Sequence, residues 1–414
     1  MLDSTRPQWR RPGVLSMVVL GLAVACGGGP DANDTSDDGN GNGGYPLDTS
    51  AYNGLIAWTA GIRFGVYVRD LDANTMLFER EPPEDRLEEL PSQPKLSADG
   101  SSLAMSLDTA VALSQIGQVH HVDLTTGTVT ALPKAIPDSD EERASTHPWP
   151  TTDGSTIAYT ENRLIYDDPS AEFPTDNTKG DIGLWTVGDA PVLLTTDDAA
   201  DYRPMLSANG AKVVFVSERD DNDGDFYIMN ANPGATPTRL RYDNHADIDD
   251  APNFETPGHV DISDNGSKLV YTAGVTEDAT GAFLLDTATG NVERIGTSGD
   301  VEYVAISEDG STLAFVDLQT SETAITYRLL TAAASDPSST TVGIETSQKN
   351  FFGLDLSADG SFVAVGQSDF QGDFPGAFHL VLLRPDGSDI TLVASEADEL
   401  GETFSNTPFY LDVR

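Results

Sequence analysis

The chain has 414 residues, of which 67 are acidic and 23 are basic, and its formal net charge is −44. So large an excess of negative charge repels phosphate backbones, so nucleic-acid binding is excluded. We interpret the acidity as a solvated, self-repelling surface, with attraction of divalent cations or basic partners as the alternative.

The first residues have the pattern of an export signal. Three arginines at positions 6, 10 and 11 precede an apolar run over residues 14–25, and Cys26 follows directly. The run is too short to cross a hydrocarbon core of about 30 Å, but it suits the apolar region of a signal peptide. We therefore predict a signal peptide over residues 1–25. Cys26 is the one cysteine of the chain, so no disulfide can form within it.

The sequence LAVAC at residues 22–26 resembles the lipobox of bacterial lipoproteins. This resemblance implies that the signal is cut before Cys26 and that the Cys26 thiol is lipidated. The alternative is an ordinary signal peptide followed by a chance cysteine. Gly27 follows the cysteine in place of aspartate, which in such lipoproteins implies the outer membrane or the cell surface, with a periplasmic location as the alternative.

Residues 26–52 are predicted to form a flexible tether. The stretch GGGPDANDTSDDGNGNGG at 27–44 has no apolar periodicity. Such a segment cannot bury enough apolar surface to fold, so we expect it to link the lipid to a domain over residues 53–414.

The domain is built from repeats. Six copies place an apolar strand, an Asp-Gly or Asn-Gly turn and a second apolar strand in succession, and the turn glycines are 44 to 56 residues apart: Gly100, Gly154, Gly210, Gly266, Gly310 and Gly360. Asp-Gly and Asn-Gly between alternating apolar runs indicate hairpins in which both turn residues favour positive φ. Two further strands complete each repeat, as in residues 119–132 and 282–295. Repeats of this length with several strands each are typical of propeller blades.

The two ends of the domain complement each other. Residues 53–58 begin at a turn and lack the first strand of a blade, whereas residues 409–413 match a first strand and end there. We therefore predict an all-β, seven-bladed β-propeller of four-stranded blades, closed by the pairing of the C-terminal strand with the N-terminal blade. Closure removes exposed sheet edges.

The repeats resemble the TolB-type, WD40-like (PD40) repeats of bacterial envelope proteins. The segment LSANG at 206–210, followed by VVFVSERD at 213–220 and FYIMN at 226–230, carries this resemblance most fully. The resemblance covers residues 53–414 and implies the propeller fold. TolB has an additional N-terminal α/β domain that this sequence lacks, so its role is not transferred.

Aligning the first strands on their turn glycines reveals a column of polar residues. Its members are Gln93, His147, Arg203, His259, Tyr303, Gly353 and Tyr410. First strands line the central channel of a propeller, so we expect a polar ring near the channel mouth that binds a ligand. The alternative is that these side chains merely fill or hydrate the channel. Oligogalacturonate lyases of this propeller type bind a metal with histidines and a glutamine in such a place, which makes His147 and His259 candidate metal ligands.

These features favour a non-catalytic cell-envelope lipoprotein that binds or scaffolds an envelope protein, peptide or glycan. We expect a monomer that contacts the membrane through its lipid anchor alone, and we predict no catalytic residues, because no G-x-S-x-G motif occurs. The alternatives are a metal-assisted, lyase-like enzyme on a carbohydrate, using a divalent cation at the channel mouth, and a purely structural component without a ligand. The fold by itself does not decide between them.

Overall fold

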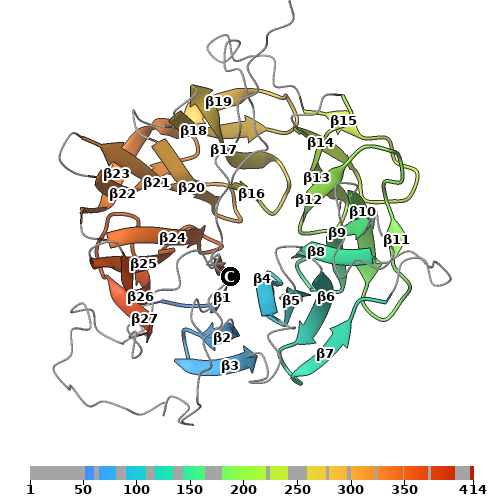
Figure 1. Ribbon diagram of the computed structural model, residues 1–414, viewed down its shortest axis with the longest axis horizontal. Helices are drawn as coiled ribbons and strands as arrows, with labels where there is room; N and C mark the ends of the chain where they lie inside the picture. Colours follow the sequence, from blue (N-terminus) through green and yellow to red (C-terminus); the bar gives the residue numbers. More distant parts are fainter. Residues whose placement is uncertain are drawn as a thin grey trace, which may run out of the picture. The chain divides into compact units, whose positions relative to one another are not determined.

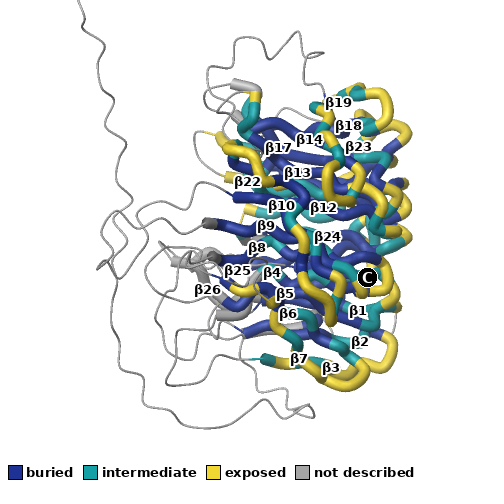
Figure 2. The backbone as a smooth tube through the Cα atoms, turned by 90° about the vertical axis from the view of Figure 1, so that its right-hand side faces the viewer, coloured by how far each residue is buried: buried dark blue, intermediate teal, exposed yellow. Residues whose placement is uncertain are grey.

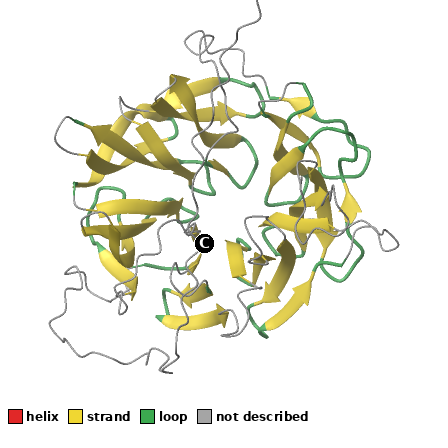
Figure 3. Ribbon diagram, in the orientation of Figure 1, coloured by secondary structure: helices red, strands yellow, loops and turns green. Residues whose placement is uncertain are grey.

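A computed structural model of the chain describes residues 52–59, 65–80, 90–108, 117–133, 143–163, 180–220, 224–240, 259–276, 279–295, 300–321, 325–347, 349–371, 374–396 and 411–414. The predicted signal peptide and Cys26 lie outside these ranges. Within them the structure consists of strands and connecting turns without any helix (Figure 3). It follows that the described part holds no helix capable of crossing a membrane.

The strands form where apolar and polar residues alternate, or where β-branched and aromatic residues follow one another. In chain order they are β1 (Leu55–Thr59), β2 (Val66–Asp70), β3 (Thr75–Arg80), β4 (Leu90–Leu96), β5 (Ser102–Asp108), β6 (Gly117–Asp123), β7 (Thr128–Ala131), β8 (Arg143–Pro150), β9 (Thr156–Arg163), β10 (Gly180–Thr186), β11 (Val192–Leu193), β12 (Asp201–Leu206), β13 (Lys212–Ser217), β14 (Asp225–Asn230), β15 (Thr238–Arg239), β16 (Val260–Ile262), β17 (Lys268–Thr276), β18 (Ala279–Asp286), β19 (Val292–Ile295), β20 (Asp300–Ile306), β21 (Thr312–Thr320), β22 (Ile325–Ala333), β23 (Asp336–Thr346), β24 (Lys349–Leu356), β25 (Val363–Gln371), β26 (Phe374–Leu383), β27 (Thr391–Glu396) and β28 (Leu411–Val413).

These strands form seven four-stranded antiparallel sheets arranged as a ring, with the first strand of each sheet innermost (Figure 1). Blade 1 has the order β28-β1-β2-β3, and blades 2 to 7 follow the chain as β4–β7, β8–β11, β12–β15, β16–β19, β20–β23 and β24–β27. The last strand pairs with the first through Ile56↔Val413, Ala57↔Asp412 and Trp58↔Leu411. The predicted seven-bladed propeller and its closure are confirmed.

The core lies between the blades. Seven clusters of buried apolar side chains occur among the described residues, one at each interface between neighbouring sheets. Figure 2 shows the burial concentrated within the strands, while the turns at their ends are exposed. The closing interface packs Leu411 and Val413 against Trp58, and it includes Tyr52, whose exposed fraction is 1%. A single blade exposes both faces, so each sheet depends on its neighbours for stability.

The turns between first and second strands are hairpins as predicted, but their conformation differs from the expectation. In blade 2 the Gly100 amide donates to the Ser97 carbonyl over 2.9 Å, and Gly100 has a φ of 68°. Asp99 does not have a positive φ. Instead its carboxylate accepts from the Ser97 hydroxyl (2.8 Å) and the Ser101 amide (2.9 Å), which fixes the turn with only glycine in the left-handed region.

A belt of backbone hydrogen bonds links these turns from blade to blade. Thr152 N donates to Ala208 O (2.9 Å), Ala208 N to Asp264 O (2.7 Å) and Asp264 N to Glu308 O (2.8 Å). The belt satisfies amide groups that a free-standing hairpin would leave to water. It therefore ties blades 3, 4, 5 and 6 directly to one another.

Candidate functional site

The predicted polar column lies where the first strands bulge. The pairing of first and second strands shifts register at Ser92/Lys95, Thr146/Trp149 and Tyr202/Met205, and likewise in the two blades that carry Tyr303 and Gly353. Gln93, His147, Arg203 and Gly353 lie within these shifts, whereas Tyr303 follows its shift directly and pairs with Val316. Such bulges redirect a side chain and interrupt the ladder, and they occur often beside functional sites.

Three of these positions hold a non-glycine residue in the left-handed region. The φ angles are 50° at Gln93, 53° at His147 and 52° at Arg203, and Gly353 has 67° at the equivalent position. A side-chain-bearing residue in this region costs about 1–2 kcal/mol. A proline follows each of the three, and proline within a strand is tolerated at a bulge because it has no amide to donate. This proline was the signal in the sequence that could have revealed the bulges.

Side chains of adjacent blades contact one another along the column. His147 N donates to Gln93 Oε1 over 2.7 Å. The His259 and Tyr303 rings lie with centroids 4.4 Å apart, and the Gly353 backbone hydrogen-bonds the Tyr303 side chain. The structure thus brings together Gln93, His147, Arg203, His259 and Tyr303, which we call the polar ring. Tyr410, the predicted seventh member of the column, lies outside the described residues.

Threonines on the second strands hold the backbone of the polar ring. The Arg203 amide donates to Thr160 Oγ1 (3.1 Å), and the His259 amide donates to Thr272 Oγ1 (2.9 Å). Both threonines are buried. These bonds satisfy the two backbone amides and hold the backbone beneath the Arg203 and His259 side chains.

The histidines of the polar ring are neutral at physiological pH. Burial, assisted by the positive charge of Arg203, lowers the pKa of His147 to about 3 and that of His259 to about 4. Burial also raises the pKa of Tyr303. Among the described members of the ring, Arg203 is therefore the charged one. A neutral imidazole offers one donor and one acceptor, so the ring is a set of neutral hydrogen-bonding groups around one guanidinium.

A second, ionic cluster lies further along the first strands, toward the turns, and the sequence analysis missed it. It consists of Lys95, Asp261, Asp264, Glu308, Asp355, Asp412 and Arg414. Three of its carboxylates bind the backbone of the following blade: Asp261 accepts from Ile306 N (3.0 Å), Asp355 from Val413 N (2.8 Å) and Asp412 from Leu96 N (2.6 Å). Asp261, Asp355 and Asp412 occupy the same position of their first strands, and this repetition could have revealed the cluster from the sequence.

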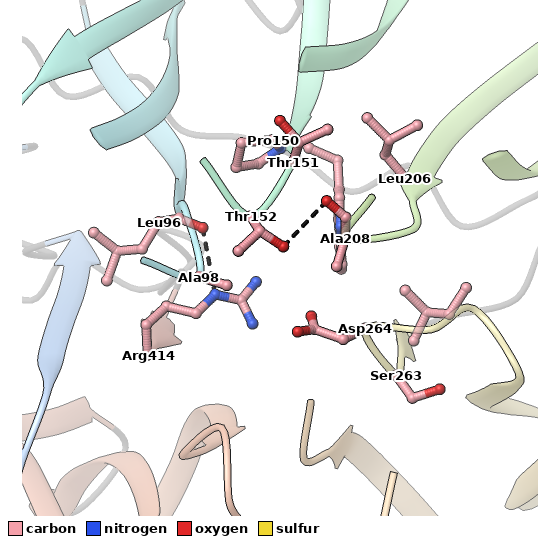
Figure 4. Close-up of a pocket in the computed structure, with 12 residues that line it drawn as sticks. Leu96, Ala98, Pro150, Thr151, Thr152, Leu206, Ala208, Ser263, Asp264 and Arg414 are labelled. Carbon is pink, nitrogen blue, oxygen red and sulfur yellow. Dashed lines mark hydrogen bonds between the residues drawn. The ribbon is translucent and has the colours of Figure 1, made fainter. Parts of the chain in front are cut away.

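The two cations of the ionic cluster, Lys95 and Arg414, connect the last strand of the chain to other blades. Lys95 Nζ lies 2.7 Å from Asp412 Oδ1 and 4.5 Å from the centroid of the Trp149 ring. Arg414 forms an ion pair with Glu308, and its Nε donates to Leu96 O over 3.3 Å. Figure 4 shows the Arg414 guanidinium and the Asp264 carboxylate pointing toward each other. Arg414 directly follows β28, and its side chain therefore links the closing blade to blade 6 through Glu308 and to blade 2 through Leu96.

Burial shifts the titration of four carboxyl groups in the ionic cluster. Burial raises the pKa of Asp355 to about 8 and that of Glu308 to about 7, in both cases against the favourable charge of Lys95 or Arg414. Burial likewise raises the pKa of Asp261 and Asp264. Asp355 therefore carries a proton at neutral pH, and Glu308 titrates near neutrality.

The small cavity beside the ionic cluster is no ligand site. It has a volume of about 10 Å³ and is bounded by Leu96, Pro150, Thr151, Ala208, Asp264 and Arg414, among others (Figure 4). That space holds about one water molecule. Nor does the described part of the chain contain a group of three or more His, Cys, Asp or Glu side chains arranged to hold a metal ion.

The fold and these two groups define a seven-bladed β-propeller protein. Among solved structures it is similar to an oligogalacturonate lyase in complex with manganese, at 16% identity and a TM-score of 0.52 over 76% of this chain and 82% of that one. Puromycin hydrolase is 11% identical with a TM-score of 0.57, over 87% of this chain and 55% of that one. TolB from Acinetobacter baumannii is 14% identical with a TM-score of 0.45, over 84% and 79%. No protein-family model and no curated protein matches the sequence.

Proposed function

We propose that this chain is an exported, non-catalytic lipoprotein whose propeller binds a cell-envelope protein, peptide or glycan at the polar ring. Lipidation of Cys26 would anchor it at the bacterial outer membrane or cell surface. Residues 26–51 would then act as a tether for the propeller, whose closing interface already includes Tyr52. A lipid anchor with several acyl chains binds a membrane firmly, whereas one chain binds it marginally.

The observation that carries this proposal is the strained backbone beneath the polar ring. Gln93, His147 and Arg203 all hold the left-handed conformation at equivalent positions of consecutive blades. Strained backbone persists where the surrounding structure enforces it, and it gathers at binding sites. Rigid strands are also better supports for a binding constellation than loops are. A purely structural channel lining would have no need of this cost at three positions.

The metal-assisted enzyme is the less supported alternative. The positive charge of Arg203 acts on both His147 and His259 and depresses the pKa of each. The same charge opposes a divalent cation between these imidazoles. The likeness to a manganese-bound lyase is one of fold, and fold does not determine function.

Partner capture tests the proposal. The full chain with Cys26→Ser, to avoid lipidation, is immobilised and exposed to envelope extract and to peptide and glycan arrays. A triple variant, Gln93→Ala/His147→Ala/His259→Ala, should lose the captured ligand while its thermal unfolding remains cooperative. The matched control is Met76→Ala/Leu77→Ala on the exposed outer strand β3, which should bind as the parent does. Equal capture by the triple variant would refute binding at the polar ring.

A further inference from the structure

The small cavity beside the ionic cluster, which we call the axial cavity, is enclosed by five different blades. Its lining includes residues of blades 1 to 5, namely Arg414, Leu96, Thr152, Ala208 and Asp264 in that blade order. The end of β28, which Arg414 follows, lies inside the ring in Figure 1. The volume of about 10 Å³ excludes every ligand larger than water, and it matches the space that one water molecule needs.

Two side chains that can carry charge face each other across the axial cavity. Figure 4 shows the Arg414 guanidinium and the Asp264 carboxyl group pointing toward each other. The direct contacts of the Arg414 side chain go to Glu308, to Asp412 and to the Leu96 carbonyl, and none of them goes to Asp264. Polar groups that face each other without direct contact are commonly joined by a bridging water.

A third polar group borders the same space. The Thr152 hydroxyl donates to the Ala208 carbonyl over 3.1 Å (Figure 4), so the lone pairs of its oxygen can still accept a hydrogen bond. The axial cavity therefore offers one donor, the guanidinium, and two acceptors, the Asp264 carboxyl group and the Thr152 hydroxyl. Three polar partners are what an internal water typically has.

The groups around the axial cavity favour a neutral occupant over an ion. A cation would meet the Arg414 guanidinium, and an anion would meet the carboxyl groups of Asp264 and of Glu308, the ion-pair partner of Arg414. Water can accept from the guanidinium and donate to the carboxyl group and the hydroxyl at the same time.

We propose that the axial cavity binds one ordered water molecule, which accepts a hydrogen bond from Arg414 and donates to Asp264 and Thr152. This water links blade 1 to blades 3 and 5, which are not its neighbours in the ring. Arg414 already joins blade 1 to blade 2 through Leu96 and to blade 6 through Glu308. The hydration site thus extends the closure of the ring across its axis, and it does not depend on what the polar ring binds.

Crystallography tests the inference directly. The full chain with Cys26→Ser is crystallised, and its electron density is examined at a resolution that shows ordered waters. We expect a water within about 3.2 Å of both the Arg414 guanidinium and the Asp264 carboxyl group. Crystals soaked in bromide or in rubidium distinguish an ion from water, and neither should give an anomalous peak at the site. An empty cavity, a direct contact between Arg414 and Asp264, or an anomalous peak would overturn the inference.

Variants of Asp264 test whether the water bridges the two side chains. Asp264→Asn retains an acceptor oxygen and should keep the water, whereas Asp264→Leu should lose it. In urea, the unfolding equilibrium constant of Asp264→Leu should exceed that of Asp264→Asn by about fivefold, the effect of one lost hydrogen bond. Asp189→Asn, in an exposed outer turn, is the matched control and should retain both the water and the parent stability. A water that persists in Asp264→Leu, or equal stability of the Leu and Asn variants, would contradict the bridge.

Discussion

Asp412 Oδ1 lies 2.7 Å from Lys95 Nζ although 317 residues separate the two side chains in the sequence. The Asp412 side chain has no exposed surface, whereas that of Lys95 is 22% exposed. Asp412 also accepts a hydrogen bond from the Leu96 amide. A single carboxylate thus joins the last strand of the chain to the blade that follows the closing blade.

Removing this carboxylate should destabilise the whole ring. Asp412→Ala leaves Lys95 without its closest counter-charge and the Leu96 amide without its acceptor, and breaking a buried ion pair in this way costs about 3–5 kcal/mol. Urea unfolding followed by circular dichroism measures the free energy of unfolding. Asp189→Ala, in an exposed turn, is the matched control and should change it by less than about 0.5 kcal/mol. Equal stability of the two variants would contradict the role of Asp412.

Deleting the last strand tests closure directly. Without residues 406–414, blade 1 loses β28 and the buried side chains of Leu411 and Val413. Burial of two such side chains stabilises by at least about 3 kcal/mol, and the edge of β1 becomes exposed. We expect a lower melting temperature and a tendency to aggregate, measured by calorimetry and size-exclusion chromatography. A deletion variant that melts like the full chain would refute closure by this strand.

The ionic cluster should make stability fall as pH rises toward about 8, the folded-state pKa of Asp355. Asp355 has a folded-state pKa of about 8 and Glu308 of about 7, both above the value of about 4 in an unfolded chain. The folded state therefore binds more protons than the unfolded state between these values, and stability is lost as pH rises through the folded pKa. Each such carboxyl contributes a slope of up to about 1.4 kcal/mol per pH unit.

The window from pH 6.5 to 8 isolates this effect. The histidines of the polar ring have lowered pKa values, so their contribution to stability is lost on acidification below their ordinary value of 6.5 and is constant above it. Asp355→Asn should flatten the dependence of the unfolding free energy on pH in this window. Asp189→Asn should leave the slope as it is in the parent. An unchanged slope in Asp355→Asn would show that Asp355 is ionised throughout.

Lipidation at Cys26 is tested by fractionation. In a Gram-negative host the chain with Cys26 should sediment with membranes, and Cys26→Ser should release it into the soluble fraction because the proposed lipid anchor is lost. Mass spectrometry of the mature N-terminus identifies the acyl groups. Continued sedimentation of Cys26→Ser with membranes would count against the lipid anchor.

Metal analysis distinguishes the proposed binding module from the metal-assisted enzyme. Because the positive charge of Arg203 acts on both His147 and His259, we expect no stoichiometric Mn, Zn or Ca in the purified chain after dialysis. Plasma emission spectroscopy measures this. Stoichiometric metal that disappears in His147→Ala/His259→Ala would favour the metal-assisted enzyme over the binding module.

Local sequence chemistry accounts for much of the fold. The turn motif around Gly100 and its five counterparts predicted the hairpins, their number predicted the blades, and the missing strands at the two ends predicted closure. The alignment on these glycines also placed six polar residues and Gly353 in one column. Each of these inferences depends on residues that are close in the chain or that repeat, because hairpins and alternating strands are local structures.

The sequence by itself therefore determined seven blades and their closure, and it predicted a polar column of which the structure brings five side chains together. Only the tertiary structure decided that Gln93, His147 and Arg203 sit on left-handed bulges, that the histidines are neutral, and that Lys95 and Arg414 stand among five carboxyl groups. The reason is physical. Backbone strain, burial and charge pairing depend on which side chains of different blades meet around the central axis, and those residues lie tens to hundreds of positions apart in the chain.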